Sequence, residues 1–153
     1  MHFNVLDPEL MDLLKLKNVQ TVTDKRIKDI DYSWGSNALF ALKVAKNEQW
    51  MLVSYAQSPE LYEAMYKGDQ SDFDRLYAEV ESDDTIVKQF ISARAIAIEA
   101  LKEGYETGRM YLHFTDEMNR HTSFKDTIYS SNLCQEIGLP TAGYDSVADL
   151  YKE

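Results

Sequence analysis

The only cysteine of the sequence, Cys134, lies between an amide and a carboxylate at two-residue spacing, Asn132 and Glu136. In an extended segment, side chains two positions apart project to the same face. A thiol, a hydrogen-bonding amide and a base would then meet one small substrate, while Leu133 and Gln135 point away. The spacing therefore predicts a site that combines sulfur chemistry with proton transfer.

Each of the three residues also has an ordinary structural interpretation. A lone cysteine is commonly a small, buried hydrophobic side chain. A glutamate is commonly a solvated surface carboxylate, and an asparagine often serves a turn. Taken one at a time, the residues favour this interpretation, so the catalytic hypothesis needs support from a longer stretch of sequence.

That support is a resemblance to a known family. The run Ser-Asn-Leu-Cys-x-Glu-Ile at 131–137 resembles the active-site finger loop of the large (alpha) subunit of class I ribonucleotide reductases. The similarity continues in register from 61 to 141 and extends more weakly upstream. The further matching positions are Leu76-Tyr77, Lys88, Glu106-Thr107-Gly108, Asp116, Asn119, Leu139-Pro140-Thr141 and, upstream, Leu14, Leu16-Lys17-Asn18, Arg26 and Asp31-Tyr32. The family's subunit is several times longer, so the resemblance implies an internal fragment of such a subunit.

The resemblance implies thiyl-radical reduction of a ribonucleoside diphosphate to the deoxyribonucleotide that DNA synthesis requires. Cys134 would be oxidised transiently to a thiyl radical and would abstract the hydrogen from the ribose 3′ carbon. Glu136 would accept the proton of the 3′ hydroxyl as a general base. Asn132 would hold the sugar in a reactive orientation by hydrogen bonding.

A second functional segment, 18–26, occupies the place of the family's specificity loop, which relays the identity of a bound effector to the substrate base. The resemblance assigns Lys17, Asn18 and Arg26 to this substrate and effector loop, with Arg26 near the substrate. Family members commonly carry glycine here, whereas residues 19–23 contain none, which leaves the effector preference open. The alternative is an ordinary polar connection with a surface arginine.

Composition and charge restrict the remaining classes of function. The 153 residues, of which 44% are hydrophobic, suffice for one globular segment with a core. A formal charge of −10 argues against binding DNA or RNA, although local cations or helix N-termini can still hold nucleotide phosphates. His113 and His121 are too few for a metal site. Without a membrane-spanning run or a signal-peptide pattern, we expect a cytoplasmic protein that binds no membrane.

The resemblance also implies which components must come from elsewhere. This segment would bind no cofactor, and a small metallo-subunit (beta) would supply the radical. Deoxynucleotide or ATP effectors would bind the full enzyme. The reducing pair of cysteines, the phosphate-binding segment and the radical-accepting tyrosines would lie in the remaining parts of the alpha subunit, because one cysteine cannot form a disulfide alone. We therefore expect no turnover from the isolated chain.

Two other functions stay open. One is an inactive remnant or acidic interaction module that retains part of the barrel without its chemistry. The other is a hydrolase that uses Cys134 as its nucleophile, which would require folding to bring a histidine near the thiol.

Apolar spacing and capping residues predict the elements that position these groups. We expect helices beginning after Asp7-Pro8 and after Ser58-Pro59, because a cap followed by proline opens a helix. The other predicted elements are a helix from Asp24 through Trp34 to Leu42, a strand at 50–54, a helix at 71–80, a long helix from Asp83 or Asp84 through Phe90 to Leu101 that ends at Gly108, a strand at 110–114, a helical turn at 116–121, and extended arms at 127–133 and 136–139.

Helices that alternate with single short strands indicate an α/β fold with parallel pairing. The resemblance implies part of a helix-rich, ten-stranded α/β barrel, with the cysteine-bearing finger loop (127–141) threaded through its centre. Residues 1–153 would form a single incomplete segment of that barrel. Its unpaired strand edges and half-covered apolar faces should make complete folding depend on the missing chain.

Overall fold

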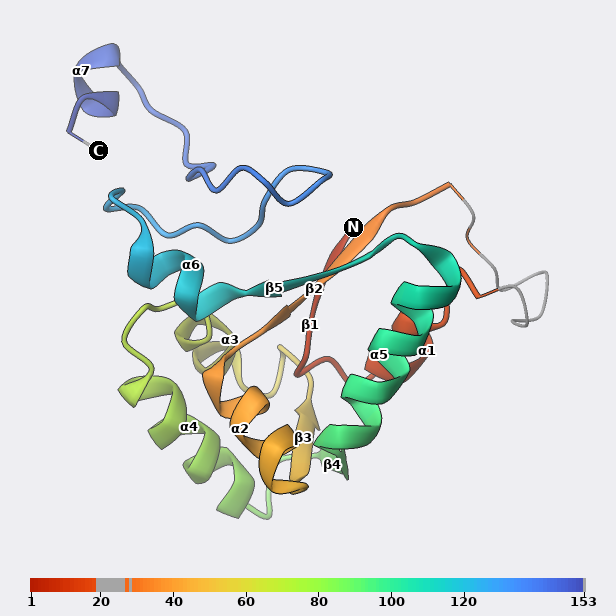
Figure 1. Ribbon diagram of the computed structural model, residues 1–153. Coiled ribbons are helices and arrows are strands. Elements are labelled where there is room, and N and C mark those ends of the chain that lie inside the picture. The colour runs from red at the N-terminus through yellow and green to blue at the C-terminus, as the bar shows by residue number, and fades with distance from the viewer. Residues whose placement is uncertain (19–26, 28, 153) are drawn as a thin grey trace.

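The computed structural model describes residues 1–18, 27 and 29–152, and Figure 1 shows how their helices and strands are arranged. In chain order these elements are β1 (His2–Asn4), α1 (Leu10–Leu14), β2 (Tyr32–Ser36), α2 (Ala38–Lys46), β3 (Gln49–Val53), α3 (Pro59–Ala64), α4 (Ser71–Ser82), β4 (Lys88–Ser92), α5 (Ala93–Thr107), β5 (Met110–Phe114), α6 (Thr115–His121) and α7 (Val147–Leu150).

The central sheet has the order β1-β2-β5, and both pairs of strands are parallel. Trp34 in the middle strand lies opposite Phe3 on one side and Leu112 on the other. The α/β class with parallel pairing is therefore confirmed. Among the described residues, no strand pairs with the outer edge of β1 or of β5, so the sheet is open and no closed barrel forms.

The two faces of this sheet differ in chemistry because successive strand residues point to opposite sides. The register places one set of polar or small residues on one face: His2, Asn4, Ser33, Gly35, Tyr111 and His113. It places a mainly apolar set on the other: Phe3, Tyr32, Trp34, Ser36, Met110, Leu112 and Phe114. The apolar face packs against α2 and α5, which lie below the sheet in Figure 1.

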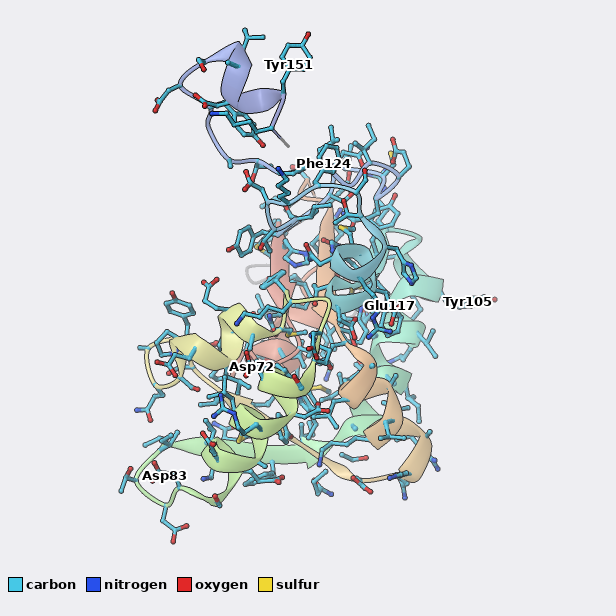
Figure 2. The ribbon with its side chains drawn as sticks, turned by 90° about the vertical axis from the view of Figure 1, so that its left-hand side faces the viewer. Asp72, Asp83, Tyr105, Glu117, Phe124 and Tyr151 are labelled. Carbon is cyan, nitrogen blue, oxygen red and sulfur yellow. The ribbon has the colours of Figure 1, made fainter. Side chains whose placement is uncertain are left out.

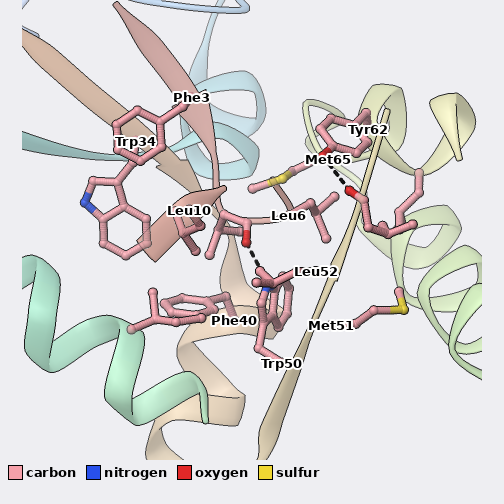
Figure 3. Packing of buried hydrophobic residues seen from close by; sticks show 14 of the residues in the cluster. Phe3, Leu6, Leu10, Trp34, Phe40, Trp50, Met51, Leu52, Tyr62 and Met65 are labelled. Carbon is pink, nitrogen blue, oxygen red and sulfur yellow. Dashed lines mark hydrogen bonds between the residues drawn. The ribbon is translucent and has the colours of Figure 1, made fainter. Parts of the chain in front are cut away.

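Aromatic packing holds the apolar side together. Phe40 of α2 makes edge-to-face contacts with Trp34 and Trp50, with ring centroids 5.6 and 5.1 Å away, and Figure 3 shows the three rings in sequence. The buried Trp50 indole donates to the carbonyl of Val5 at 2.9 Å, so its one polar atom is satisfied. Through Trp50, the second sheet, β3-β4, belongs to the same hydrophobic core as the segment that follows β1.

Two of the predicted helices are wrong in part. Residues 32–36 form strand β2, and the helix begins only at Ala38, where the Asn37 side chain accepts from the amide of Phe40 at 3.0 Å. Likewise, residues 88–92 form β4, antiparallel to β3, and α5 begins after Ser92. In both segments, backbone pairing with a strand remote in sequence outweighs an apolar spacing that also fits a helix.

The other predicted helices and strands are confirmed, with shifts of a few residues at their ends, whereas the arms expected to be extended at 127–133 and 136–139 form no strand, and residues 133–134 belong to a turn. Helix α3 begins at Pro59 and buries Leu61 and Met65 completely. Strand β5 has the predicted bounds. Gly108, at φ 67°, ends α5 in the left-handed conformation that glycine adopts most readily.

Beyond α6, residues 122–146 contain no helix or strand, and Figure 1 shows this blue segment on the side of β5 away from α2 and α5. Asn119 of α6 fixes its start, because its side chain donates to the carbonyl of Ile128 and accepts from the amide of the same residue, at 2.9 and 2.8 Å. Ile128 is 1% exposed. The finger-loop region is thus attached to the body before it reaches Cys134.

Candidate functional site

The cysteine lies in a tight turn and not in an extended segment. The amide of Gln135 donates to the carbonyl of Asn132 at 3.2 Å, and Gln135 has a left-handed φ of 64°. Asn132 stabilises the turn, since its side-chain oxygen accepts from the amide of Ile137 at 2.9 Å. The expectation that alternate side chains here share one face through an extended backbone is therefore wrong.

This turn presents its two reactive side chains to solvent. Cys134 and Glu136 are exposed, whereas Asn132 and Gln135 are partly buried. An exposed thiol excludes the ordinary interpretation of Cys134 as a buried hydrophobic residue in this chain. The catalytic roles of Cys134, Glu136 and Asn132 stay predictions.

A cavity of about 390 Å³ lies between the turn and the polar face of the sheet. Asn132 and Gln135 line it from the turn, and Ser33 and Tyr111 line it from the strands. Its volume falls within the range of pockets that hold small organic ligands, about 300–1,000 Å³. The cavity next to the cysteine turn, lined by both polar and apolar side chains, is therefore large enough for a small organic ligand.

The base of the predicted specificity loop reaches the same cavity. The Lys17 ammonium, which is almost fully buried, donates to Asp31 at 2.8 Å, and Asp31 lines the cavity. Hydrogen bonding from Lys17 lowers the pKa of Asp31, and the nearby Arg109 contributes in the same direction. Asn132 thus lines the cavity directly, whereas Lys17 is linked to it only through Asp31.

Asn18 fastens the start of the loop to helix α5. Its side-chain nitrogen donates to Glu103 at 2.6 Å and to Glu106 at 2.8 Å. Burial raises the pKa of Glu103, because a desolvated carboxylate is disfavoured in its charged form. Arg26, the third predicted loop residue, lies outside the described residues, as does most of the predicted loop 18–26.

The structure adds two histidines that the sequence did not assign to the site. His2 and His113 lie on the polar face with ring centroids 5.1 Å apart, and the Nδ1 of His2 is 2.8 Å from the Ser33 hydroxyl. Burial lowers the pKa of His2 to about 4, with a further contribution from His113, and burial also lowers the pKa of His113. The available signal was the alternation of β5, which places His113 on the same face as Tyr111.

Metal and hydrolytic chemistry find little support in the part of the chain that is described. No group of three or more His, Cys, Asp or Glu side chains there is arranged to hold a metal ion. Within the same residues, Cys134 forms no hydrogen bond with a histidine, which the hydrolase hypothesis would need. The ring nitrogen of His113 nearest the turn is occupied by Gln135 instead.

Comparison with known proteins identifies the family. Residues 1–150 match the family model described as the barrel domain of ribonucleotide reductase. The chain belongs to the ribonucleotide reductase barrel-domain family. The resemblance drawn from the finger-loop motif is thereby confirmed, and the open parallel sheet is a part of this barrel.

The relatives of this barrel domain are much longer proteins. The chain is 38% identical over 136 residues to ribonucleoside-diphosphate reductase 1 subunit alpha of Escherichia coli K12, covering 87% of the chain and 18% of that protein. It is 37% identical over 142 residues to the subunit alpha of enterobacteria phage T4, covering 90% of the chain and 19% of the relative. The large subunit of Arabidopsis thaliana is 30% identical over 131 residues, or 84% of the chain and 15% of the relative.

The matched part of the chain therefore covers 15% to 19% of the length of these reductase subunits. Over the residues described here, no helix is both long enough and apolar enough to cross a membrane.

Proposed function

We propose that this chain is the segment of a ribonucleoside-diphosphate reductase large subunit that carries the radical-bearing cysteine, and that it works only in assembly with the rest of that subunit. The observation that carries the proposal is the position of the cysteine turn, within a family-matched barrel segment, beside a cavity that Asn132, Leu133 and Gln135 line. Cys134 lies between these lining residues in sequence; it does not line the cavity itself and is exposed. The exposure of the thiol supports it, because a radical carrier must reach its substrate.

In the proposed reaction, a thiyl radical on Cys134 takes the hydrogen atom from the ribose 3′ carbon, which restores the thiol and leaves the unpaired electron on the sugar. Glu136 accepts the 3′ hydroxyl proton as general base, and Asn132 orients the sugar from its place on the cavity wall. The radical comes from a partner metallo-subunit. A cysteine pair in the rest of the alpha subunit supplies two electrons as its disulfide forms, and deoxynucleotide or ATP effectors act through the 18–26 loop.

The need for assembly follows from surfaces that the described residues leave uncovered. Both outer edges of the parallel sheet are open. An apolar groove of about 500 Å³ runs between α2, α5 and the sheet, and several of its hydrophobic side chains are exposed, Tyr105 by 92% and Leu101 by 73%. Figure 2 shows Tyr105 projecting away from the ribbon. Further chain of the same subunit would cover these surfaces, since the relatives are about five times longer than the matched segment.

Reconstitution tests the proposal. The chain is co-expressed with the remaining parts of an alpha subunit, the beta subunit is added, and reduction of a ribonucleoside diphosphate is followed by product analysis. We expect turnover that Cys134→Ser abolishes. Ser123→Ala, at an exposed position on the same C-terminal segment, is the matched control and should keep wild-type activity. Turnover that persists in Cys134→Ser would reject the proposal.

The alternative of an inactive acidic interaction module predicts assembly without turnover. Figure 2 shows Asp72 and Asp83 at the surface around α4, where such a module would present its charge. The acidic surface is partly neutralised, because Arg75 pairs with Asp72 and with Glu79. A complex that forms normally but is inactive with every effector would favour this alternative. A cytoplasmic location stays a prediction under both proposals.

A further inference from the structure

One side-chain contact ties the cysteine turn to the sheet. The Gln135 amide nitrogen donates to the carbonyl of Asn132 at 2.9 Å, and its oxygen lies 2.9 Å from Nδ1 of His113. Because a carbonyl can only accept, the amide must turn its nitrogen to Asn132 and its oxygen to His113. His113 therefore carries its proton on Nδ1 and donates it to Gln135, across 22 positions of sequence.

The histidine end of this contact is held rigidly. His113 is 4% exposed, and its ring lies against that of His2, which is bonded in turn to Ser33. Gly35 leaves room for the pair, since a Cβ there would lie 3.1 Å from Nε2 of His2 and 3.0 Å from a methyl carbon of Thr115. The donor thus rests on all three strands of the parallel sheet and has little freedom to turn away.

The glutamine end needs such an anchor. Gln135 has the left-handed backbone that a residue with a Cβ adopts only at an energetic cost, so the bonds that Asn132 makes within the turn act against an unfavourable backbone conformation. Its side chain lies beneath the turn, toward β5, while its two sequence neighbours, Cys134 and Glu136, are exposed. Fixing Gln135 therefore fixes the direction in which the thiol and the carboxylate are presented.

We propose that His113 and Gln135 form a latch that positions the turn bearing Cys134 and Glu136. Both are positioning residues, because they act through the turn. The latch is a property of the fold, whereas its effect on turnover rests on the proposed function.

The latch is tested first without turnover. Hydrogen exchange is measured at the amides of Gln135 and Ile137, which are bonded within the turn, in the full chain. His113→Phe keeps a ring of similar size and removes the donor, and should speed exchange at both amides about tenfold, the loss expected for one hydrogen bond with a buried partner. His113→Asn places an amide N–H near the former Nδ1 and should restore slow exchange. His121→Phe, at an exposed histidine, is the matched control.

Gln135→Leu removes the acceptor without altering the buried strand, so it tests the latch even if His113→Phe fails to fold. Gln135→Leu also removes the bond to the Asn132 carbonyl, so the double variant should exchange as fast as Gln135→Leu alone, in which the contact with His113 is already lost. Exchange that stays slow in Gln135→Leu, or effects that add fully in the double variant, would overturn the latch.

Turnover in the reconstituted enzyme is the second readout. His113 does not line the cavity, so His113→Phe should lower kcat about tenfold and change KM less than twofold, and His113→Asn should recover most of kcat. Faster exchange together with an inactive wild-type complex would leave the latch standing and reject the proposed function. The positioning role would be overturned if the reconstituted enzyme is active and His113→Phe leaves its kcat unchanged although amide exchange is faster.

Discussion

The two faces of the parallel sheet are built from alternate residues of the same three strands, yet they differ in almost every physical property. The apolar face packs large rings, among them Trp34, against two helices and contributes to the main core. The polar face is bordered by a cavity and a loop, and two buried histidine nitrogens there, Nε2 of His2 and of His113, have no hydrogen-bond partner within the part of the chain that the structure describes. One face holds the segment together, and the other carries polar side chains beside a cavity.

The largest difference should appear between two adjacent residues of β2. Trp34 is 3% exposed on the apolar face, and Trp34→Ala should lower the free energy of unfolding by about 3–5 kcal/mol. The hydroxyl of its neighbour Ser33 hydrogen-bonds to His2 on the polar face, and Ser33→Ala should lower this free energy by about 1 kcal/mol. Urea unfolding followed by far-ultraviolet circular dichroism measures both. Equal losses of unfolding free energy in the two variants would contradict the conclusion that the apolar face contributes more to stability than the polar face.

A smaller effect should distinguish the two faces through the pH dependence of the free energy of unfolding. Burial lowers the pKa of His2 from 6.5 to about 4, so the unfolded chain binds the proton more readily. The stability that His2 contributes is complete above pH 6.5 and is lost as the pH falls toward 4. At roughly 1.4 kcal/mol per pKa unit, the loss is about 2–3 kcal/mol. Unfolding free energies of the wild type and His2→Gln, compared between pH 7 and pH 4, should show a flatter profile in the variant.

The exposed histidine provides the control for this measurement. His121→Gln, at a solvent-exposed site on α6, should keep the slope of the wild type. A wild-type slope that survives in His2→Gln would show that carboxylates alone govern the acid range and that the buried histidine pair is not the sensitive group.

How far the sequence predicts this arrangement depends on the range of the interactions involved. Local signals were sufficient for α3, where Ser58 and Pro59 open the helix and the spacing of Leu61 buries it. They failed at β2 and β4, because the spacing of residues such as Trp34 and Phe90 fits a helix and a strand equally until a remote partner strand is known.

The same limit applies to the site. The motif around Cys134 and its resemblance to a family indicated which residues to consider, and the family is confirmed. Their arrangement was not predicted, because Gln135 of the turn contacts His113, 22 positions away, and no local spacing encodes that contact. The alternation of β5 does place His113 on the polar face, but only the folded chain brings Gln135 beneath the turn.

The smallest effect on the free energy of unfolding should come from an exposed residue that lines the apolar groove. Tyr105 is 92% exposed, so Tyr105→Lys should change the free energy of unfolding of the chain by no more than about 0.5 kcal/mol. If the rest of the subunit covers the groove, the same change buries an ammonium in an apolar contact and weakens assembly. Co-purification with the remaining subunit parts measures this, with Lys102→Ala, at an exposed α5 position outside the groove, as control. Undiminished assembly of Tyr105→Lys would mean that this part of the apolar face stays in solvent, and that the open sheet edges carry the association.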